Sequence, residues 1–210
     1  MTEPLLDGPA DAPIRLILAH GAGQDADSPF LSTLATALAE DGLRVERFRF
    51  PYMQRMLETG GRRPPDREPV LIDAWRNAIA ESLSRRGRCE RLVIGGKSLG
   101  GRIASMIADD SPAAALVCLG YPFHPPGRPE QLRVAHLAGL ATPTLICQGT
   151  RDPFGSRDEL PRWPLSPAIR VAWIEDGEHS FKPRARSGYS WEGNLAQAAA
   201  QTLGFIRGLA

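Results

Sequence analysis

The chain has 210 residues, and its 25 Lys and Arg residues nearly balance its 24 Asp and Glu residues, giving a net charge of +1. This length suits one domain, and the balanced charge gives no general electrostatic footprint for nucleic acid or for an anionic membrane. With 42% hydrophobic and 23% charged residues, the composition is that of a globular chain with a buried core. We therefore expect a single domain over residues 1–210, with a flexible segment over 1–12.

Six short apolar runs predict β-strands. Most are rich in Val, Ile and Leu without clean polar alternation, which is typical of strands covered on both faces by helices. The runs occupy residues 14–20, 43–50, 91–96, 114–121, 143–149 and 169–175.

Apolar residues at helical spacing predict four helices between and after these runs. Ser28 and Pro29 supply a cap and an N1 proline for the first helix. The spaced residues are Leu31, Leu34, Ala35 and Leu38, then Leu71, Trp75, Ala78 and Ile79, then Leu99, Ile103, Met106 and Ile107, and finally Leu195, Ala199, Leu203 and Ile206. Strands that alternate with helices predict an α/β fold, with a mostly parallel sheet of about six strands and helices on both faces.

The cysteine pattern and the N-terminus bear on the compartment. The chain has an odd number of cysteines, Cys89, Cys118 and Cys147, and no two of them form a CxxC motif. This pattern is typical of buried thiols in a reducing compartment. The opening MTEPLLDGPADAP has neither the basic nor the apolar region of a secretory signal. No apolar run approaches the ~18 residues of a membrane-spanning helix. We expect a cytoplasmic protein.

A candidate nucleophile lies after the third predicted strand. Parallel sheets bind ligands at the carboxyl ends of their strands, and there Gly96-Lys97-Ser98-Leu99-Gly100 fits the pattern G-x-S-x-G. Between a strand and a helix, this pattern predicts a nucleophile elbow with Ser98 at the tip of a sharp turn. Side chains at positions 96 and 100 would collide with neighbouring backbone. The amide of Leu99 would then be able to stabilise an oxyanion.

A serine nucleophile needs a base that an acid orients. Proteins with this elbow place them in the order Ser, then Asp or Glu, then His. Asp152 follows the fifth predicted strand and His179 the sixth, so they are the predicted acid and base. Asp176 and Glu178 remain alternative acids because they neighbour His179. We prefer Asp152 because an orienting carboxylate usually reaches the imidazole from an adjacent strand end.

The segment His20-Gly21-Ala22-Gly23 follows the first predicted strand. Its glycines allow the backbone to approach a substrate, and an amide near Ala22 would be a second oxyanion donor. We expect the side chain of His20 to be buried and structural.

Six segments between residues 20 and 181 carry a wider pattern: HGAGQDADSPFL at 20–31, FRFPYM at 48–53, GRRPPD at 61–66, GGKSLGGRIAS at 95–105, QGTRDPFG at 148–155 and DGEHSF at 176–181. On these segments the chain resembles an α/β-hydrolase. More narrowly, it resembles the KANL3/Tex30-like α/β-hydrolase family, which is related to small dienelactone-hydrolase-like esterases. The resemblance implies an α/β-hydrolase fold with Ser98, Asp152 and His179 as the triad. It implies no particular substrate, because some relatives look more like subunits of chromatin-modifying complexes than like enzymes.

Two nucleotide-binding interpretations are disfavoured. Gly96-Lys97-Ser98 mimics the end of a P-loop, but that motif needs glycine at position 91, where this chain has Arg. The glycines at 21 and 23 weakly fit a dinucleotide fingerprint, but the next strand ends in Arg49-Phe50 rather than in an acidic residue. No organic cofactor and no metal is expected.

Arginines gather in the segment 47–67, which we expect to be a loop. Among them, Arg62 and Arg63 lie between two glycines and two prolines. They either pair with nearby acids or form a cationic rim that recognises a carboxylate or phosphate on a substrate. The segment 123–140, where larger relatives insert a lid, is short, so we expect an open site without a large lid.

The leading hypothesis is a serine hydrolase that acts on a small ester or thioester. Ser98 attacks the acyl carbon, His179 takes and returns the proton, Asp152 holds the imidazole, and the amides of Ala22 and Leu99 bind the oxyanion. Its partner is a small acyl substrate, with no nucleic acid and no membrane. The alternative is a non-catalytic binding or scaffold protein that retains the fold.

Overall fold

Seven β-strands form one sheet in residues 3–209, the part of the chain that the computed structural model describes. The sheet order is β1-β3-β2-β4-β5-β6-β7, and every neighbouring pair is parallel except β1 with β3. The strands are β1 (Leu5–Asp7), β2 (Ile14–Ala19), β3 (Arg44–Phe48), β4 (Arg91–Lys97), β5 (Ala115–Leu119), β6 (Thr144–Gly149) and β7 (Ile169–Ile174). The six predicted runs correspond to β2 through β7, and the α/β fold with a mostly parallel sheet is confirmed.

The additional strand, β1, lies at the N-terminus. It runs antiparallel to β3, with Leu6 opposite Glu46, and Asp7 forms an ion pair of 3.0 Å with Arg47. The expectation of a flexible segment over residues 1–12 is therefore wrong for residues 5–7, because this short strand pairs the open edge of β3. Residues 1 and 2 lie outside the described residues.

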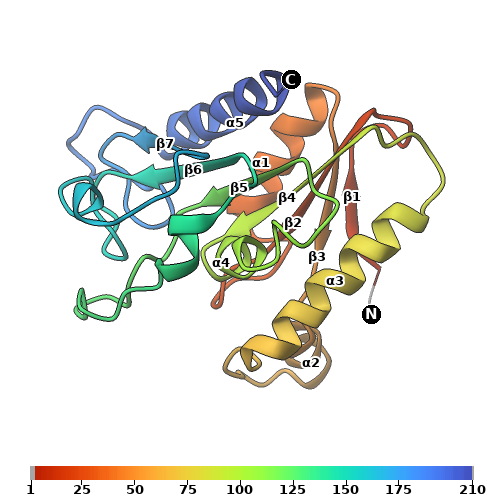
Figure 1. Ribbon diagram of the computed structural model, residues 1–210, viewed down its shortest axis with the longest axis horizontal. Helices are drawn as coiled ribbons and strands as arrows, with labels where there is room; N and C mark the ends of the chain where they lie inside the picture. Colours follow the sequence, from red (N-terminus) through yellow and green to blue (C-terminus); the bar gives the residue numbers. More distant parts are fainter. Residues whose placement is uncertain (1–2, 210) are drawn as a thin grey trace.

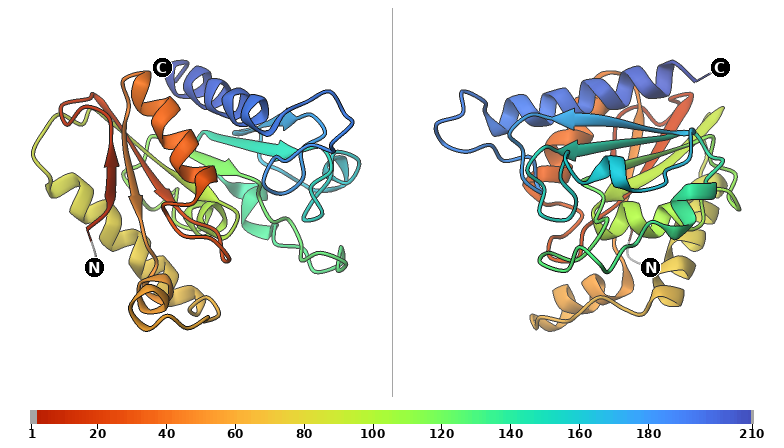
Figure 2. Two further views of the ribbon diagram at one scale, coloured as in Figure 1. Left: turned by 180° about the vertical axis from the view of Figure 1, so that it is seen from behind. Right: turned by 60° about the vertical axis from the view of Figure 1, so that its left-hand side comes forward.

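Helices cover both faces of the sheet (Figures 1 and 2). In Figure 1, α5 and α1 lie above the sheet, and α3 and α4 lie below it, with α2 beneath the end of α3. The helices are α1 (Pro29–Glu40), α2 (Pro51–Thr59), α3 (Glu68–Ser84), α4 (Leu99–Ser105) and α5 (Trp191–Arg207), with 3₁₀-helices η1 (Ala135–Gly139) and η2 (Leu160–Arg162).

Each face of the sheet has its own hydrophobic core. Successive strand side chains point to opposite faces, so Leu16 and Leu18 pack toward α1 and α5, whereas Ile17 packs toward α2, α3 and α4. Burial on both faces explains why most of the strand sequences show no clean polar alternation.

Helix α2 was not predicted from the sequence, where we expected a loop over 47–67. Pro51 stands in the first turn of the helix, and Gly60 ends it with a φ of 68°, a left-handed conformation that glycine adopts without strain. Tyr52 and Met53 are buried. The arginine-rich segment is therefore partly anchored in the core.

The carboxyl ends of the parallel strands remain uncovered by any large insertion. Between β5 and β6, residues 120–143 contain η1 as their one helix, so the predicted absence of a large lid is confirmed. Within residues 3–209, no helix has the length and apolar character to cross a membrane.

Candidate active site

Ser98 stands at the tip of a sharp turn between β4 and α4. Its backbone has φ 50° and ψ −112°, a conformation that residues with a side chain rarely adopt. A Cβ on Gly96 would lie 2.3 Å from the carbonyl oxygen of Ala19, and one on Gly100 would lie 2.4 Å from the same atom. Ala19 ends β2, so the turn packs directly against the adjacent strand. This is the turn, with the collisions, that the G-x-S-x-G pattern predicted.

Ser98, His179 and Asp152 form a continuous chain of hydrogen bonds. Ser98 Oγ lies 2.8 Å from His179 Nε2, and His179 Nδ1 lies 2.8 Å from Asp152 Oδ2 and 3.1 Å from Oδ1. A carboxylate only accepts hydrogen bonds, so Nδ1 carries the imidazole proton. His179 Nε2 is then free to accept the hydroxyl proton of Ser98. The structure therefore brings together three residues that follow three different strands and are far apart in the sequence.

Asp152 is held in place by hydrogen bonds from residues close to it in the sequence. The residue is buried, and it accepts hydrogen bonds from Gln148 Nε2 at 3.0 Å and from the amide of Phe154 at 2.9 Å. Gln148 also donates to the carbonyl oxygens of Tyr121 and Gly155 and accepts from the amide of Tyr121. Gln148 was not among the predicted site residues, although a polar residue inside the apolar run 143–149 was a usable signal.

Asp176 and Glu178, the alternative acids, have other partners. Asp176 forms ion pairs with Arg151 and Arg184 and accepts a hydrogen bond from the amide of Arg184. Glu178 accepts hydrogen bonds from the amides of Ser180 and Lys182. Both carboxylates therefore shape the loop that carries the imidazole rather than contact the imidazole itself.

The loop after β2 is fixed from beneath by His20 and Tyr52. The amide of Phe50 donates to His20 Nε2 at 3.1 Å, so Nδ1 carries the proton and donates to the carbonyl oxygen of Gly21 at 2.7 Å. Tyr52 Oη donates to the carbonyl oxygens of Gly21 and Ala22. Burial lowers the pKa of His20 and keeps it neutral. His20 is thus the buried structural histidine that we expected. Hydrogen bonds join the segment FRFPYM (48–53) to the segment HGAG (20–23).

The amides of Ala22 and Leu99 have no hydrogen-bond acceptor among residues 3–209. Leu99 is the first residue of α4, where a helix leaves its amides unpaired and pointing outward. Ala22 lines the same cleft as Ser98. Both amides are therefore available to a ligand.

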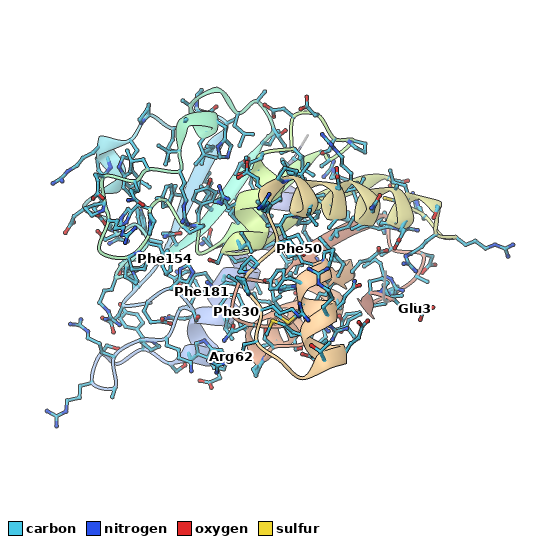
Figure 3. The ribbon with its side chains drawn as sticks, turned by 90° about the horizontal axis from the view of Figure 1, so that it is seen from below. Glu3, Phe30, Phe50, Arg62, Phe154 and Phe181 are labelled. Carbon is cyan, nitrogen blue, oxygen red and sulfur yellow. The ribbon has the colours of Figure 1, made fainter. Side chains whose placement is uncertain are left out.

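A cleft of about 220 Å³ opens beside Ser98 and His179. Phe154 forms one wall, and its ring stacks on the imidazole of His179 with centroids 4.1 Å apart. Phe30 and Phe181, which are labelled in Figure 3 and do not line the cleft, pack against each other with ring centroids 5.2 Å apart. The lining residues are Gly21, Ala22, Gly23, Gln24, Lys97, Ser98, Phe154, His179 and Ser180.

Arg62 and Arg63 do not line this cleft. Both are exposed between α2 and α3 and have no ion-pair partner within the described chain. Other arginines of the cluster are paired, because Arg49 binds Asp25 through three hydrogen bonds and Arg55 binds Asp66. The interpretation of paired surface arginines thus fits part of the cluster, and the role of Arg62 and Arg63 stays a prediction.

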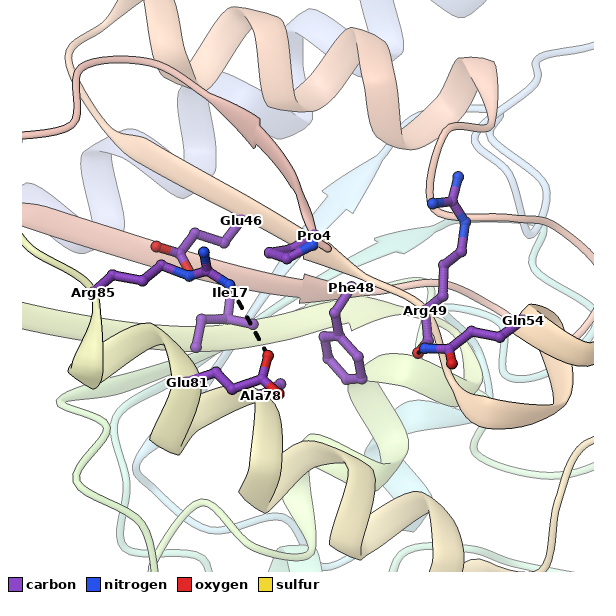
Figure 4. A pocket seen from close by; sticks show the side chains of 9 residues that line it. All are labelled: Pro4, Ile17, Glu46, Phe48, Arg49, Gln54, Ala78, Glu81 and Arg85. Atoms are coloured by element: carbon purple, nitrogen blue, oxygen red, sulfur yellow. Dashed lines mark hydrogen bonds and ion pairs between the residues drawn. The ribbon is translucent and has the colours of Figure 1, made fainter. Parts of the chain in front are cut away.

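A second hollow, between β3 and α3, shares no residue with the cleft (Figure 4). Its volume is about 10 Å³, which is room for no more than one water molecule. Arg85 extends between Glu46 at 3.7 Å and Glu81 at 4.0 Å. This hollow is a gap in the packing and too small for a substrate.

The electrostatics favour a neutral His179. Burial lowers the pKa of the imidazole and the ammonium of Lys97 lowers it further, whereas the hydrogen bond to Asp152 opposes both effects. A neutral imidazole is the form that can accept a proton from a hydroxyl group. Among residues 3–209, no group of three or more His, Cys, Asp and Glu side chains is placed to hold a metal ion.

The comparisons with known proteins agree with this architecture. A family model described as an alpha/beta hydrolase domain matches residues 12–207. The chain therefore belongs to the alpha/beta hydrolase domain family.

Solved structures that are similar to this chain include three hydrolases. An alpha-beta serine hydrolase homologue from Coxiella burnetii has 20% identity and a TM-score of 0.65, over 100% of this chain and 98% of that one. Dienelactone hydrolase from Anabaena variabilis has 22% identity and a TM-score of 0.66, over 98% and 91%. A Xanthomonas campestris serine hydrolase described as lacking a lid has 20% identity and a TM-score of 0.65, over 96% of each chain. These likenesses support the α/β-hydrolase fold.

Proposed function

We propose that this protein is a serine hydrolase that cleaves a small ester or thioester through an acyl-enzyme on Ser98. Ser98 Oγ attacks the acyl carbon while its proton passes to His179 Nε2. The leaving group takes that proton when the tetrahedral intermediate collapses. Water then attacks the acyl-enzyme by the same route, and the carboxylic acid is released.

One observation carries this proposal: the hydrogen-bond chain from Ser98 through His179 to Asp152, placed beside an open cleft. Asp152 fixes the imidazole and stabilises the imidazolium that forms. The unpaired amides of Ala22 and Leu99 are the proposed oxyanion donors, and one such donor typically contributes about 3 kcal/mol of transition-state stabilisation.

The cleft favours a small substrate. Its volume of about 220 Å³ is below the range of roughly 300–1,000 Å³ that is typical of sites for drug-sized ligands. No large insertion covers it, and Phe154 supplies an apolar wall. A short acyl group fits these dimensions better than a long lipid chain.

Within the wider family, the FPYM and GRRPPD segments favour a relationship to the KANL3/Tex30-like proteins.

We also propose that the protein works in a reducing compartment such as the cytoplasm. Cys118 and Cys147 are free and buried in adjacent strands, and burial raises the pKa of both thiols, which makes them poor nucleophiles.

The test is hydrolysis of p-nitrophenyl acetate by the wild type, by Ser98→Ala and by Ser84→Ala as a control on the exposed face of α3. We expect Ser98→Ala to lose about 10⁶-fold in kcat, as in other enzymes with such triads, and Ser84→Ala to lose nothing. Turnover by Ser98→Ala above a tenth of wild type would exclude Ser98 as the nucleophile. A wild type that turns over no ester or thioester would favour the binding or scaffold alternative.

A further inference from the structure

The side chain of Lys97, next to the proposed nucleophile, is buried without a hydrogen-bond partner. The residue is 4% exposed, and its Nζ has no hydrogen-bond partner and no contact with solvent in the described structure. An unpaired buried ammonium is costly, and it is usually tolerated only where it performs a function or is balanced by nearby opposite charge. Although Lys97 lines the cleft, its ammonium is too deeply buried to contact a substrate there.

The ammonium of Lys97 lies beneath the loop that carries His179. Both groups lie close to Gly120. A Cβ on this residue would lie 3.0 Å from Lys97 Nζ and 3.4 Å from His179 Nδ1. Because Gly120, with φ 66°, has no side chain, the ammonium and the imidazole can approach each other there. On its other side, Nζ lies 5.5 Å from the centroid of the Phe30 ring, whose face attracts a cation.

The residue type itself is unusual for this chain. Of its 25 basic residues, 23 are arginines, and Lys97 and Lys182 are the two lysines. Arginine keeps its charge under all ordinary conditions and demands several hydrogen-bond acceptors, whereas lysine is a compact point charge that loses its proton readily when buried. A lysine at 97 is therefore suited to an electrostatic role in a space without acceptors.

We propose that Lys97 is a positioning residue whose buried ammonium keeps the imidazole of His179 neutral, and hence able to accept the proton of Ser98, in weakly acidic solution. The proposal rests on the function proposed above for Ser98 and His179. Lys97 touches no substrate in this role and acts through the imidazole alone.

The charges around Lys97 support this role. Burial lowers the pKa of Lys97 to about 8, while the carboxylates of Asp152 and Glu178 oppose that shift. The ammonium in turn lowers the pKa of His179, which Asp152 and Glu178 raise. Two carboxylates and one ammonium thus surround the imidazole. Without the ammonium, the two carboxylates would favour the imidazolium, which cannot serve as a base.

The first test compares the pH dependence of kcat/KM for p-nitrophenyl acetate in the wild type, K97M and K182M. Methionine is unbranched and close to lysine in size, and it removes the charge. Lys182 is an exposed lysine above the Trp191 ring. We expect the acid limb of K97M to move up by about one pH unit, and the K182M limb to stay in place. Above pH 8, where Lys97 itself loses its proton, K97M and the wild type should converge. An unmoved acid limb in K97M would overturn the proposal.

The second test needs no turnover. In the Ser98→Ala background, NMR titration of the His179 ring nitrogens should give a higher pKa with K97M than without it. If this titration shifts while the wild type hydrolyses no ester, the electrostatic role of Lys97 stands and the proposed function fails. If both variants titrate alike in folded protein, the role of Lys97 fails whatever the activity.

Discussion

Gln148 donates a hydrogen bond from Nε2 to Oδ2 of Asp152 over 3.0 Å, from inside the strand that precedes this carboxylate. The same amide nitrogen donates to the carbonyl oxygens of Tyr121 and Gly155. One side chain thus ties the end of β5 to the loop after β6. Because His179 takes its orientation from Asp152, the position of the imidazole depends on a glutamine that does not contact it.

Replacement of Gln148 by Ala should therefore lower kcat more than it changes KM. If Asp152 is held less firmly, the imidazole is misplaced, and a misplacement of about 1 Å lowers the reaction rate by up to ~10²-fold. The variant should also lose about 1–3 kcal/mol of unfolding free energy, because buried partners in the backbone are left unpaired. Steady-state kinetics and urea unfolding measure the two effects. Unchanged kcat in a folded Gln148→Ala variant would show that Asp152 is held by its own loop alone.

The identity of the acid is tested by three substitutions at constant size. Asp152→Asn should lower kcat by up to ~10⁴-fold, because an amide favours the wrong imidazole tautomer. Asp176→Asn and Glu178→Gln should cost far less activity, since both carboxylates bind within the loop rather than to the imidazole. Kinetics with p-nitrophenyl acetate compares them. A loss at Asp176 equal to that at Asp152 would mean that the arrangement seen here is not the working one.

The exposed pair Arg62 and Arg63 is tested with two esters. If these residues form a cationic rim, changing both to Ala should raise KM for a succinyl-type ester and leave an acetyl ester almost unaffected. Added salt should also lower kcat/KM for the succinyl ester in the wild type. Equal effects on both esters, without salt dependence, would identify the two arginines as ordinary surface charges.

The buried ammonium of Lys97 should make stability depend on pH. The pKa of Lys97 is about 8 in the folded protein, against 10.5 for a lysine side chain exposed to water. Between pH 8 and pH 10.5 the unfolded chain therefore binds the lysine proton more tightly than the folded protein does. The contribution of Lys97 to the free energy of unfolding rises as the pH increases over this range. Below pH 8, K97M should be more stable than the wild type by up to ~3 kcal/mol, and the difference should fade toward pH 10.5. Urea unfolding at pH 7, 9 and 10 checks this, and a less stable K97M at pH 7 would contradict it.

Much of the architecture was predictable because it depends on local signals. Most of the strands β2 to β7 are short runs rich in Val, Ile and Leu, and Gly96 and Gly100 mark a turn that only glycine allows. The chain order of Ser98, Asp152 and His179, and their positions after the carboxyl ends of parallel strands, were enough to predict that the three residues lie close together. Each of these signals lies within a few residues of the feature that it predicts.

The features that were not predicted depend on distant contacts. Strand β1 has three residues, and its pairing with β3 across about 40 positions fixes it. Helix α2 lies in an arginine-rich segment, and Tyr52 is buried there because it reaches the loop after β2. Gln148 looked like one polar residue in a strand, and Lys97 looked like a variable position of G-x-S-x-G. Their roles follow from neighbours that only the folded chain supplies.

The most direct measurement is reaction of the folded protein with a fluorophosphonate probe, followed by intact-mass analysis and mapping of the modified residue. A serine activated by His179 should take up one equivalent of probe on Ser98. Ser98→Ala should take up none under the same conditions, whereas Ser84→Ala should react like the wild type. A wild type that remains unlabelled, or labelling that persists in Ser98→Ala, would contradict the assignment of Ser98 as an activated nucleophile.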